Sequence, residues 1–244
     1  MGPEGSLLVL ITSTYPRNLY LPQWVGQLHG RAGTELPRGS DDGYMTAVNP
    51  DATTTPTAGV TASLAIIMDE LGATAGALTA HRSENLDAVA ETLAGARAIF
   101  VLGAGRSGLA LQMTAMRLMH LGLRVHVVGE VTAPAIGPGD VLLTASGSGT
   151  TTSIVRGADA AVTAGAQVAV ITTAEVSPLA ALATAIVIVP AAGKLDRSAS
   201  VSAQYAGSLF EQTVMLLGDA LFHSLWQRSE QSADDLWPRH SNLE

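Results

Sequence analysis

The sequence contains no cysteine, which excludes disulfides, thiolate catalysis and zinc held by cysteine ligands. Aromatic residues amount to only 4% of the chain and charged residues to 14%. The 13 basic residues form no cluster and the formal net charge is −8, so nucleic acid is not expected as a partner. No apolar run approaches the roughly 20 residues that cross a bilayer. We therefore expect no membrane association and predict a cytoplasmic protein.

Hydrophobic residues are abundant at 47%, and they are mostly alanine, valine and leucine, which suits helices packed against a sheet. Residues 1–58 contain more than half of the 11 prolines and sustain no helical or strand period. This composition predicts a poorly ordered N-terminal extension. Met45 is a candidate start, and a chain that begins there is expected to keep full activity. The alternative is that residues 1–44, which include Tyr20 and Trp24, form a docking segment.

From residue 60 onward, helical periods alternate with short apolar runs that are typical of buried strands. The predicted helices cover approximately 60–78, 83–96, 106–121, 150–165, 177–184 and 204–227, and the predicted strands 98–103, 124–129, 140–146, 167–173 and 185–190. Continuous apolar strands separated by helices indicate a parallel sheet that is covered on both faces. We therefore predict one α/β domain over residues 59–228, a doubly wound parallel sheet of about five strands flanked by helices. Residues 229–244 form a polar C-terminal tail in this interpretation.

The first loop that suggests chemistry is "GAGRSG", where Gly103, Gly105 and Gly108 have G-x-G-x-x-G spacing after a predicted strand. This spacing is found in dinucleotide-binding turns, and Glu130 follows at roughly the distance of the acid that binds the ribose. Glycines also let backbone N–H groups approach any phosphate at a helix N-terminus. Arg106 adds a positive charge that is suited to holding such an anion.

The second loop is "ASGSGTTTS", residues 145–153, in which six of the nine residues carry a hydroxyl and two are glycine. Ser146, Ser148 and Thr151 offer hydroxyls, and Gly147 allows a close approach of the backbone. Any turn from a strand to a helix tends to be rich in glycine and serine, so either loop alone is compatible with a purely structural role. Because a dinucleotide explains only the first loop, the two together favour a phosphate site, with Gly105, Arg106 and Ser107 on its other side.

The segments "GAGRSG", "MRLMHLG", "VVGE", "SGSGTT" and "GSLFEQ" resemble, in this order, signature segments of the 6-phospho-3-hexuloisomerases, a branch of the sugar isomerase (SIS) domain superfamily. The resemblance runs from about residue 64 to residue 227. It implies that Ser107, Ser146, Ser148 and Thr151 contact the substrate phosphate. Thr150 stands where the family loop often has an acid, and this departure leaves the hydroxyls in place.

The activity that the resemblance implies is conversion of D-arabino-hex-3-ulose 6-phosphate to fructose 6-phosphate through an enediolate. This reaction needs a base at carbon and a hydrogen-bond donor to the developing oxyanion, but no cofactor and no metal. Glu211 is the candidate base, although Ser208 to Glu211 is also a capping-box pattern. His120 is a candidate proton shuttle, although a histidine at a helix C-terminus is also favoured by the helix dipole.

Three other functions remain open at this point: a different aldose–ketose isomerase of the superfamily, a non-catalytic sensor that only binds a sugar phosphate, and an NAD-binding protein. The apolar helices near 60–95 and 204–227 predict a homo-oligomer, a dimer or a tetramer. The resemblance also implies a place in the ribulose monophosphate route of formaldehyde fixation. The pathway partner would then be 3-hexulose-6-phosphate synthase.

Overall fold

The computed structural model describes residues 59–196 and 198–243. The predicted extension over residues 1–58 lies outside this range and stays a prediction. The described elements, in chain order, are α1 (Val60–His81), α2 (Ser83–Ala94), β1 (Ile99–Gly103), α3 (Gly105–His120), β2 (Val125–Val127), β3 (Val141–Ala145), α4 (Thr152–Thr163), β4 (Gln167–Thr172), the 3₁₀ turn η1 (Ala180–Leu182), β5 (Ala185–Ile188), α5 (Ser208–Arg228), α6 (Ala233–Leu236) and the 3₁₀ turn η2 (Trp237–Arg239).

The five strands form one sheet in the order β2-β1-β3-β4-β5, and every neighbouring pair is parallel. Ile99 of β1 pairs with Val125 of β2 on one side and with Val141 of β3 on the other. The predicted α/β fold with about five strands is therefore confirmed. Because β1 is followed by β2 on one side and by β3 on the other, the strand order reverses at β1, and ligands commonly bind at such a switch point.

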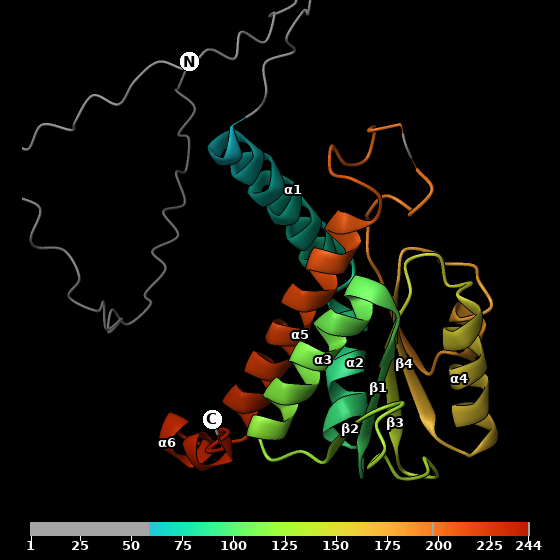
Figure 1. The fold of residues 1–244 in the computed structure, drawn as a ribbon, viewed down its shortest axis with the longest axis vertical. Helices are drawn as coiled ribbons and strands as arrows, with labels where there is room; N and C mark the ends of the chain where they lie inside the picture. The colour runs from blue at the N-terminus through green and yellow to red at the C-terminus, as the bar shows by residue number, and fades with distance from the viewer. Residues whose placement is uncertain (1–58, 197, 244) are drawn as a thin grey trace, which may run out of the picture. The chain divides into compact units, whose positions relative to one another are not determined.

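Helices cover the sheet unequally on its two faces. Helices α2, α3 and α5 lie against one face, and α4 lies against the other (Figure 1). Side chains alternate between the faces as the strand period requires: Ile99 and Val101 belong to the core under α3 and α5, and Phe100 belongs to the core under α4. The predicted helix over 177–184 is reduced to the single turn η1, because only 12 residues separate β4 from β5.

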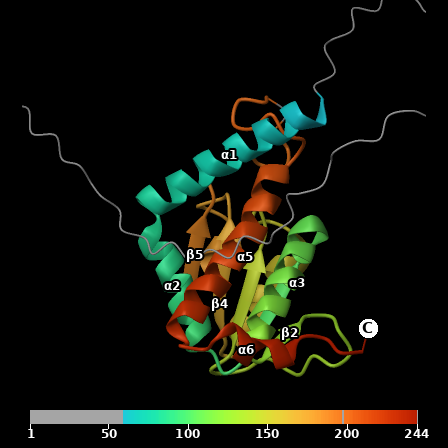
Figure 2. The ribbon, with the colours of Figure 1, turned by 90° about the vertical axis from the view of Figure 1, so that its left-hand side faces the viewer.

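Helices α3 and α5 cross so closely at Gly218 that no side chain fits between them at this position. A Cβ atom at this position would overlap the hydroxyl of Thr114 and would lie 3.0 Å from the Thr114 Cβ. Both helices begin at the carboxyl edge of the sheet and run to its amino edge (Figure 2). The close crossing therefore fixes where their N-termini stand relative to each other.

Helix α1 packs on α5 through its C-terminal half, where Thr74 and Leu78 are buried. Its N-terminal half exposes apolar side chains, including Leu64 at 56% and Met68 at 58%. Among the described residues, α1 is the one helix that is long and apolar enough to cross a membrane, with a mean hydropathy of 1.2. Length and composition alone are weak grounds for a membrane span. The exposed apolar surface does indicate that α1 is incompletely covered in the single chain.

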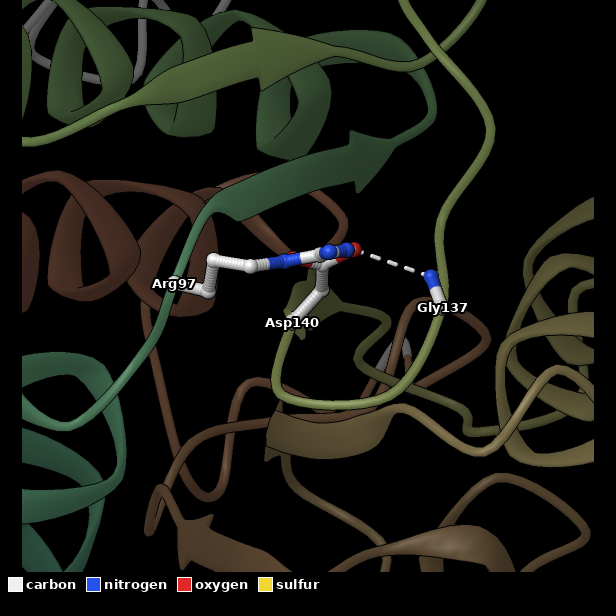
Figure 3. A network of polar contacts seen from close by, with 3 residues as sticks. All are labelled: Arg97, Gly137 and Asp140. Carbon is white, nitrogen blue, oxygen red and sulfur yellow. Dashed lines mark hydrogen bonds and ion pairs between the residues drawn. The ribbon is translucent and has the colours of Figure 1, made fainter.

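An ion pair between the exposed Arg97 and the buried Asp140 links the segments that lead into β1 and β3 (Figure 3). The Asp140 carboxylate, whose side chain is 1% exposed, accepts hydrogen bonds from Arg97 Nε at 2.9 Å and Nη2 at 2.7 Å. The backbone N–H of Gly137 donates a third at 2.9 Å. The hydrogen bonds from Arg97 hold the pKa of Asp140 below its usual value in spite of burial, so the carboxylate is charged and fully partnered.

Residues 229–243, the predicted polar tail, fold back onto the end of α3 and α5. Leu236 of α6 is buried in the main core, and Ser232 and Asp235 form a capping box at the start of α6. Gln231 Nε2 donates to the carbonyl oxygen of Leu121 at 3.2 Å. The tail thus covers the C-terminal ends of α3 and α5, away from the carboxyl ends of the strands (Figure 1).

Candidate active site

The two loops of interest come together with the start of α5 at the carboxyl edge of the sheet. They line one pocket of about 190 Å³. The predicted substrate-binding residues Gly105, Arg106, Ser107, Ser146, Gly147, Ser148 and Thr151 all line it, and so does the candidate base Glu211. These residues come from three separate segments of the chain. The pocket lies at the switch point between β1 and β3, where ligands bind in sheets of this class.

The glycines of the first loop have a structural explanation that does not require a dinucleotide. Gly105 has a φ of 57°, a left-handed conformation that L side chains rarely adopt. A Cβ at Gly103 would lie 2.6 Å from the Gly108 Cα, and a Cβ at Gly108 would lie 2.7 Å from the Gly103 carbonyl oxygen. First and third glycines therefore let β1 and α3 touch, and the second makes the turn. Glu130 does not line the pocket.

The second loop is held from beneath, so that its hydroxyls face the pocket in a fixed arrangement. The carbonyl oxygen of Gly147 accepts hydrogen bonds from Thr173 N at 3.1 Å, Thr173 Oγ1 at 2.8 Å and Thr172 Oγ1 at 3.2 Å. Ser146 Oγ lies 3.1 Å from Thr151 Oγ1. Because Ser146 is buried at 5% exposure, its hydroxyl is presented from a rigid position.

Three helices begin at the pocket, and none of the three has a side-chain cap. The N-cap residues are Ala104 for α3, Thr151 for α4 and Gly207 for α5, and no N-cap side chain accepts a hydrogen bond from its helix. The first backbone N–H groups of a helix have no partner within the helix, and they carry partial positive charge. Three such ends together with serine and threonine hydroxyls make a site that suits a phosphate group.

Glu211 does not form the capping box that its spacing with Ser208 allows. The helix begins at Ser208 with Gly207 as its N-cap, and the Glu211 carboxylate pairs with Arg106, with Oε2 at 3.1 Å from Nη1. The same Nη1 donates to Ser208 Oγ at 3.1 Å. The Glu211 side chain is 26% exposed, and it lines the pocket. A half-buried carboxylate beside a guanidinium and a phosphate site is an arrangement suited to proton transfer.

His120, the candidate proton shuttle, lies at the other end of α3 and does not line the pocket that contains Glu211. The helix runs for 16 residues from Gly105 to His120, which separates its ends by about 24 Å at 1.5 Å per residue. The His120 ring is buried and stacks on His240 with centroids 4.2 Å apart. Burial, together with the charges of His240 and Arg117, lowers the pKa of His120. Within the described chain these contacts suit a structural role, and the role of His120 as a proton shuttle stays a prediction.

Lys194, which the sequence analysis does not single out, also lines the pocket. It comes from the segment between β5 and α5, and it adds a second positive charge to that of Arg106. The signal that sequence reasoning passed over was position: this segment leaves a strand at the carboxyl edge, where the ligand of such a sheet binds. Among the described residues, no cluster of three or more histidine, aspartate or glutamate side chains has the arrangement of a metal site.

A parallel sheet that presents hydroxyl loops and uncapped helices at one pocket defines a sugar-phosphate-binding α/β protein of the SIS type. Residues 92–215 match the SIS domain family. The chain is 50% identical over 185 residues to the 3-hexulose-6-phosphate isomerase of Mycobacterium gastri, covering 76% of this chain and 92% of the relative. It is 35% identical to the 3-hexulose-6-phosphate isomerase of Bacillus subtilis, covering 74% of this chain and 97% of the relative.

A solved structure of a similar protein has the same fold. The crystal structure of a Methanococcus jannaschii protein, described as inferring a molecular function of 3-hexulose-6-phosphate isomerase, superposes with a TM-score of 0.64 at 27% identity. The match covers 75% of this chain and 99% of that chain. The chain belongs to the SIS domain family and, within it, to the 3-hexulose-6-phosphate isomerases.

Proposed function

We propose that this chain converts D-arabino-hex-3-ulose 6-phosphate to fructose 6-phosphate, the activity of a 3-hexulose-6-phosphate isomerase. The observation that carries the proposal is the 50% identity to the Mycobacterium gastri isomerase over most of both chains. The pocket agrees with it, because an anion cradle and a carboxylate lie within one small site. The comparisons favour this isomerase over the sensor and over other sugar-phosphate isomerases of the family.

In the proposed mechanism the phosphate of the substrate binds the two loops. Hydroxyls of Ser107, Ser146, Ser148 and Thr151 and the open N–H groups of α3 and α4 donate to its oxygens. The loops are braced before the ligand arrives, because strand β4 already holds the carbonyl of Gly147. Little ordering of the site is then required on binding, which favours affinity.

Glu211 is the proposed base. It removes the proton from C2, which leaves an enediolate across C2 and C3. The O2 hydroxyl proton then passes to the adjacent O3, and Glu211 returns its proton to C3 as the carbonyl forms at C2. Arg106 stands beside the carboxylate and donates to the oxygen on which negative charge develops. The 6-phosphate blocks closure of a five-membered ring from C3, so the substrate enters as an open chain and no group for ring opening is needed.

Turnover of 3-hexulose 6-phosphate by the purified protein tests the proposal directly. Thermal stability in the presence of fructose 6-phosphate, NAD and inorganic phosphate adds a binding test that needs no activity. Stabilisation by fructose 6-phosphate with turnover supports the isomerase. Stabilisation without turnover on any sugar phosphate would indicate the sensor, and stabilisation by NAD alone would contradict both.

We further propose that the chain works as a homo-oligomer, a dimer or a tetramer, in the cytoplasm. The support is the exposed apolar surface of α1, where Val60, Leu64, Ile66 and Met68 are all more than 40% exposed. Light scattering gives the assembled mass, and Leu64→Glu is expected to reduce it. Flotation with lipid vesicles is the matched control, because α1 would drive binding to vesicles if it were instead a membrane segment.

The substrate also points to a reaction that precedes this one. A hexulose 6-phosphate is formed when a one-carbon aldehyde adds to a five-carbon ketose phosphate, so 3-hexulose-6-phosphate synthase is the proposed pathway partner. Formaldehyde fixation by the ribulose monophosphate route is then the proposed setting. A coupled assay of the two enzymes with formaldehyde and ribulose 5-phosphate is expected to yield fructose 6-phosphate only when this protein is added.

A further inference from the structure

The loop between β5 and α5 is fastened to α1 by one carboxylate, that of Glu70. Its Oε2 accepts hydrogen bonds from Ser202 Oγ at 2.7 Å and from Gln204 Nε2 at 3.0 Å, and its Oε1 accepts one from the backbone N–H of Ala203 at 2.7 Å. Ser202 is buried at 8% exposure, whereas Glu70 is half-buried and Ala203 is exposed, so the contact lies partly within the protein. Burial raises the pKa of Glu70, but the hydrogen bonds from Ser202, Gln204 and Ala203 outweigh it and the net shift is downward. These three hydrogen bonds, which we call the Glu70 clamp, are therefore made by an ionised carboxylate.

The same loop supplies one wall of the active-site pocket. Ala192, Lys194 and Gly207 line the pocket, and the last of these is the N-cap of α5. Residues 189–196 and 198–207 contain no helix or strand, so no ladder of backbone hydrogen bonds holds this wall in place. Figures 1 and 2 both show α1 and this loop at the same end of the molecule, beyond the carboxyl ends of the strands.

The backbone of the loop is strained at two alanines. Ala199 has a φ of 56° and Ala206 a φ of 49°, in the left-handed region that residues other than glycine rarely adopt. Such conformations persist only where surrounding contacts hold them. The residues that Glu70 holds, 202–204, lie between these two alanines. The hydrogen bonds from Glu70 of α1 thus stabilise the part of the loop that lies between the two strained alanines.

We propose that Glu70 is a positioning residue: by holding residues 202–204 it fixes the pocket wall and keeps the Lys194 ammonium where the phosphorylated sugar binds. This inference rests on the proposed function, because a fixed lysine matters for an anionic ligand. No residue of α1 lines the pocket itself. The helix takes part in the site through the loop, and its contribution is to affinity rather than to proton transfer.

The test is a double-mutant cycle between Glu70 and Lys194, with KM and kcat for 3-hexulose 6-phosphate as readouts. Glu70→Ala removes an acceptor of three hydrogen bonds, and we expect KM to rise about tenfold or more while kcat changes much less. In a Lys194→Ala background, the same substitution is expected to leave KM nearly unchanged, because the two residues act as a unit. Asp69→Ala, which removes the exposed neighbouring carboxylate, is the matched control and is expected to behave as wild type.

Tryptic cleavage after Lys194, measured without substrate, reports on the loop independently of activity. Glu70→Ala and Ser202→Ala are both expected to accelerate it, and the second variant leaves α1 intact if the first folds poorly. Equal fold-changes of KM in the two backgrounds, or unchanged cleavage rates in folded variants, would overturn the proposal. Faster cleavage in the variants of a protein that turns over no sugar phosphate would instead sustain the clamp and reject the proposed function.

Discussion

The two ends of α3 differ in whether their terminal backbone groups have hydrogen-bond partners. At its N-terminus, beside Gly105, the helix opens into the pocket without a side-chain cap. At its C-terminus the last carbonyls are occupied: that of His120 accepts from Arg239 Nη1 at 3.2 Å, and that of Leu121 accepts from Gln231 Nε2 at 3.2 Å. In α3, therefore, the open backbone groups lie at the pocket, and the satisfied groups lie where residues 229–243 pack against the helix.

The largest effect that this comparison predicts is at the open end, for Glu211→Gln. The amide keeps the shape of the side chain but cannot take the C2 proton, so we expect kcat to fall by about 10²–10⁴ while the fold and phosphate binding survive. Exchange of the C2 proton with deuterated solvent is expected to fall in parallel. Asp219→Asn, an exposed acid further along α5, serves as the control. Activity within a few-fold of wild type would remove Glu211 from the mechanism.

The next effect concerns affinity at the hydroxyl loop. Replacing Ser146 and Ser148 by alanine together removes two donors to the phosphate, and each hydrogen bond to a charged group contributes about 1.5–3 kcal/mol. KM is therefore expected to rise by roughly two orders of magnitude or more, with a smaller change in kcat. Ser153→Ala, in α4 and outside the pocket, is expected to leave KM unchanged. An unchanged KM in the double variant would show that phosphate binds elsewhere.

At the amino edge of the sheet, opposite the pocket, we expect substitutions to affect stability alone. Arg97→Ala is expected to have a larger effect there than substitution of His120 or His240. Without Arg97, the buried Asp140 carboxylate keeps only the N–H of Gly137 and loses its counter-charge. Because the pKa of Asp140 is lowered in the folded protein, its contribution to stability is present above the ordinary aspartate pKa and is lost as pH falls through the lowered one. Melting temperatures should therefore differ most at neutral pH and converge in acid. Arg124→Ala should show no such convergence.

The smallest effect is expected for His240→Ala and His120→Ala, which break the stacked pair. Turnover should be unchanged, and the melting temperature should fall modestly. The pKa of His120 is lowered by burial and by His240 and Arg117, so the stability it gives is present above the ordinary histidine pKa and is lost as pH falls below it. A kcat loss approaching the roughly 10²-fold of an acid–base group would return His120 to the mechanism.

Sequence reasoning predicted the parallel sheet from apolar strand runs. It selected the two loops from glycine spacing and hydroxyl clusters, and Glu211 from the family resemblance. The structure brings these residues together in one pocket, and their roles stay predictions. Sequence reasoning did not reveal that the 16 residues of α3 separate His120 from the pocket at the helix N-terminus, because motif order does not show helix length, and the role of His120 stays a prediction. It passed over Lys194 and Glu70 because their roles depend on contacts over long sequence distances, such as the 132 residues between Glu70 and Ser202. The fold of residues 229–243 likewise depends on the burial of Leu236 in the main core, and no local sequence pattern predicts this contact.

The close crossing of α3 and α5 at Gly218 determines the direction of the N-terminal part of α5. The N-terminus of α5 at Ser208 is ten residues from this crossing, or about 15 Å at 1.5 Å per residue. A side chain at position 218 would have to displace Thr114, and a resulting tilt of about 5° would swing the start of α5 by roughly 1.3 Å over that length. A misplacement of about 1 Å can cost on the order of 10²-fold in rate. The absence of one methyl group at position 218 therefore helps to set the position of Glu211 in the pocket lining.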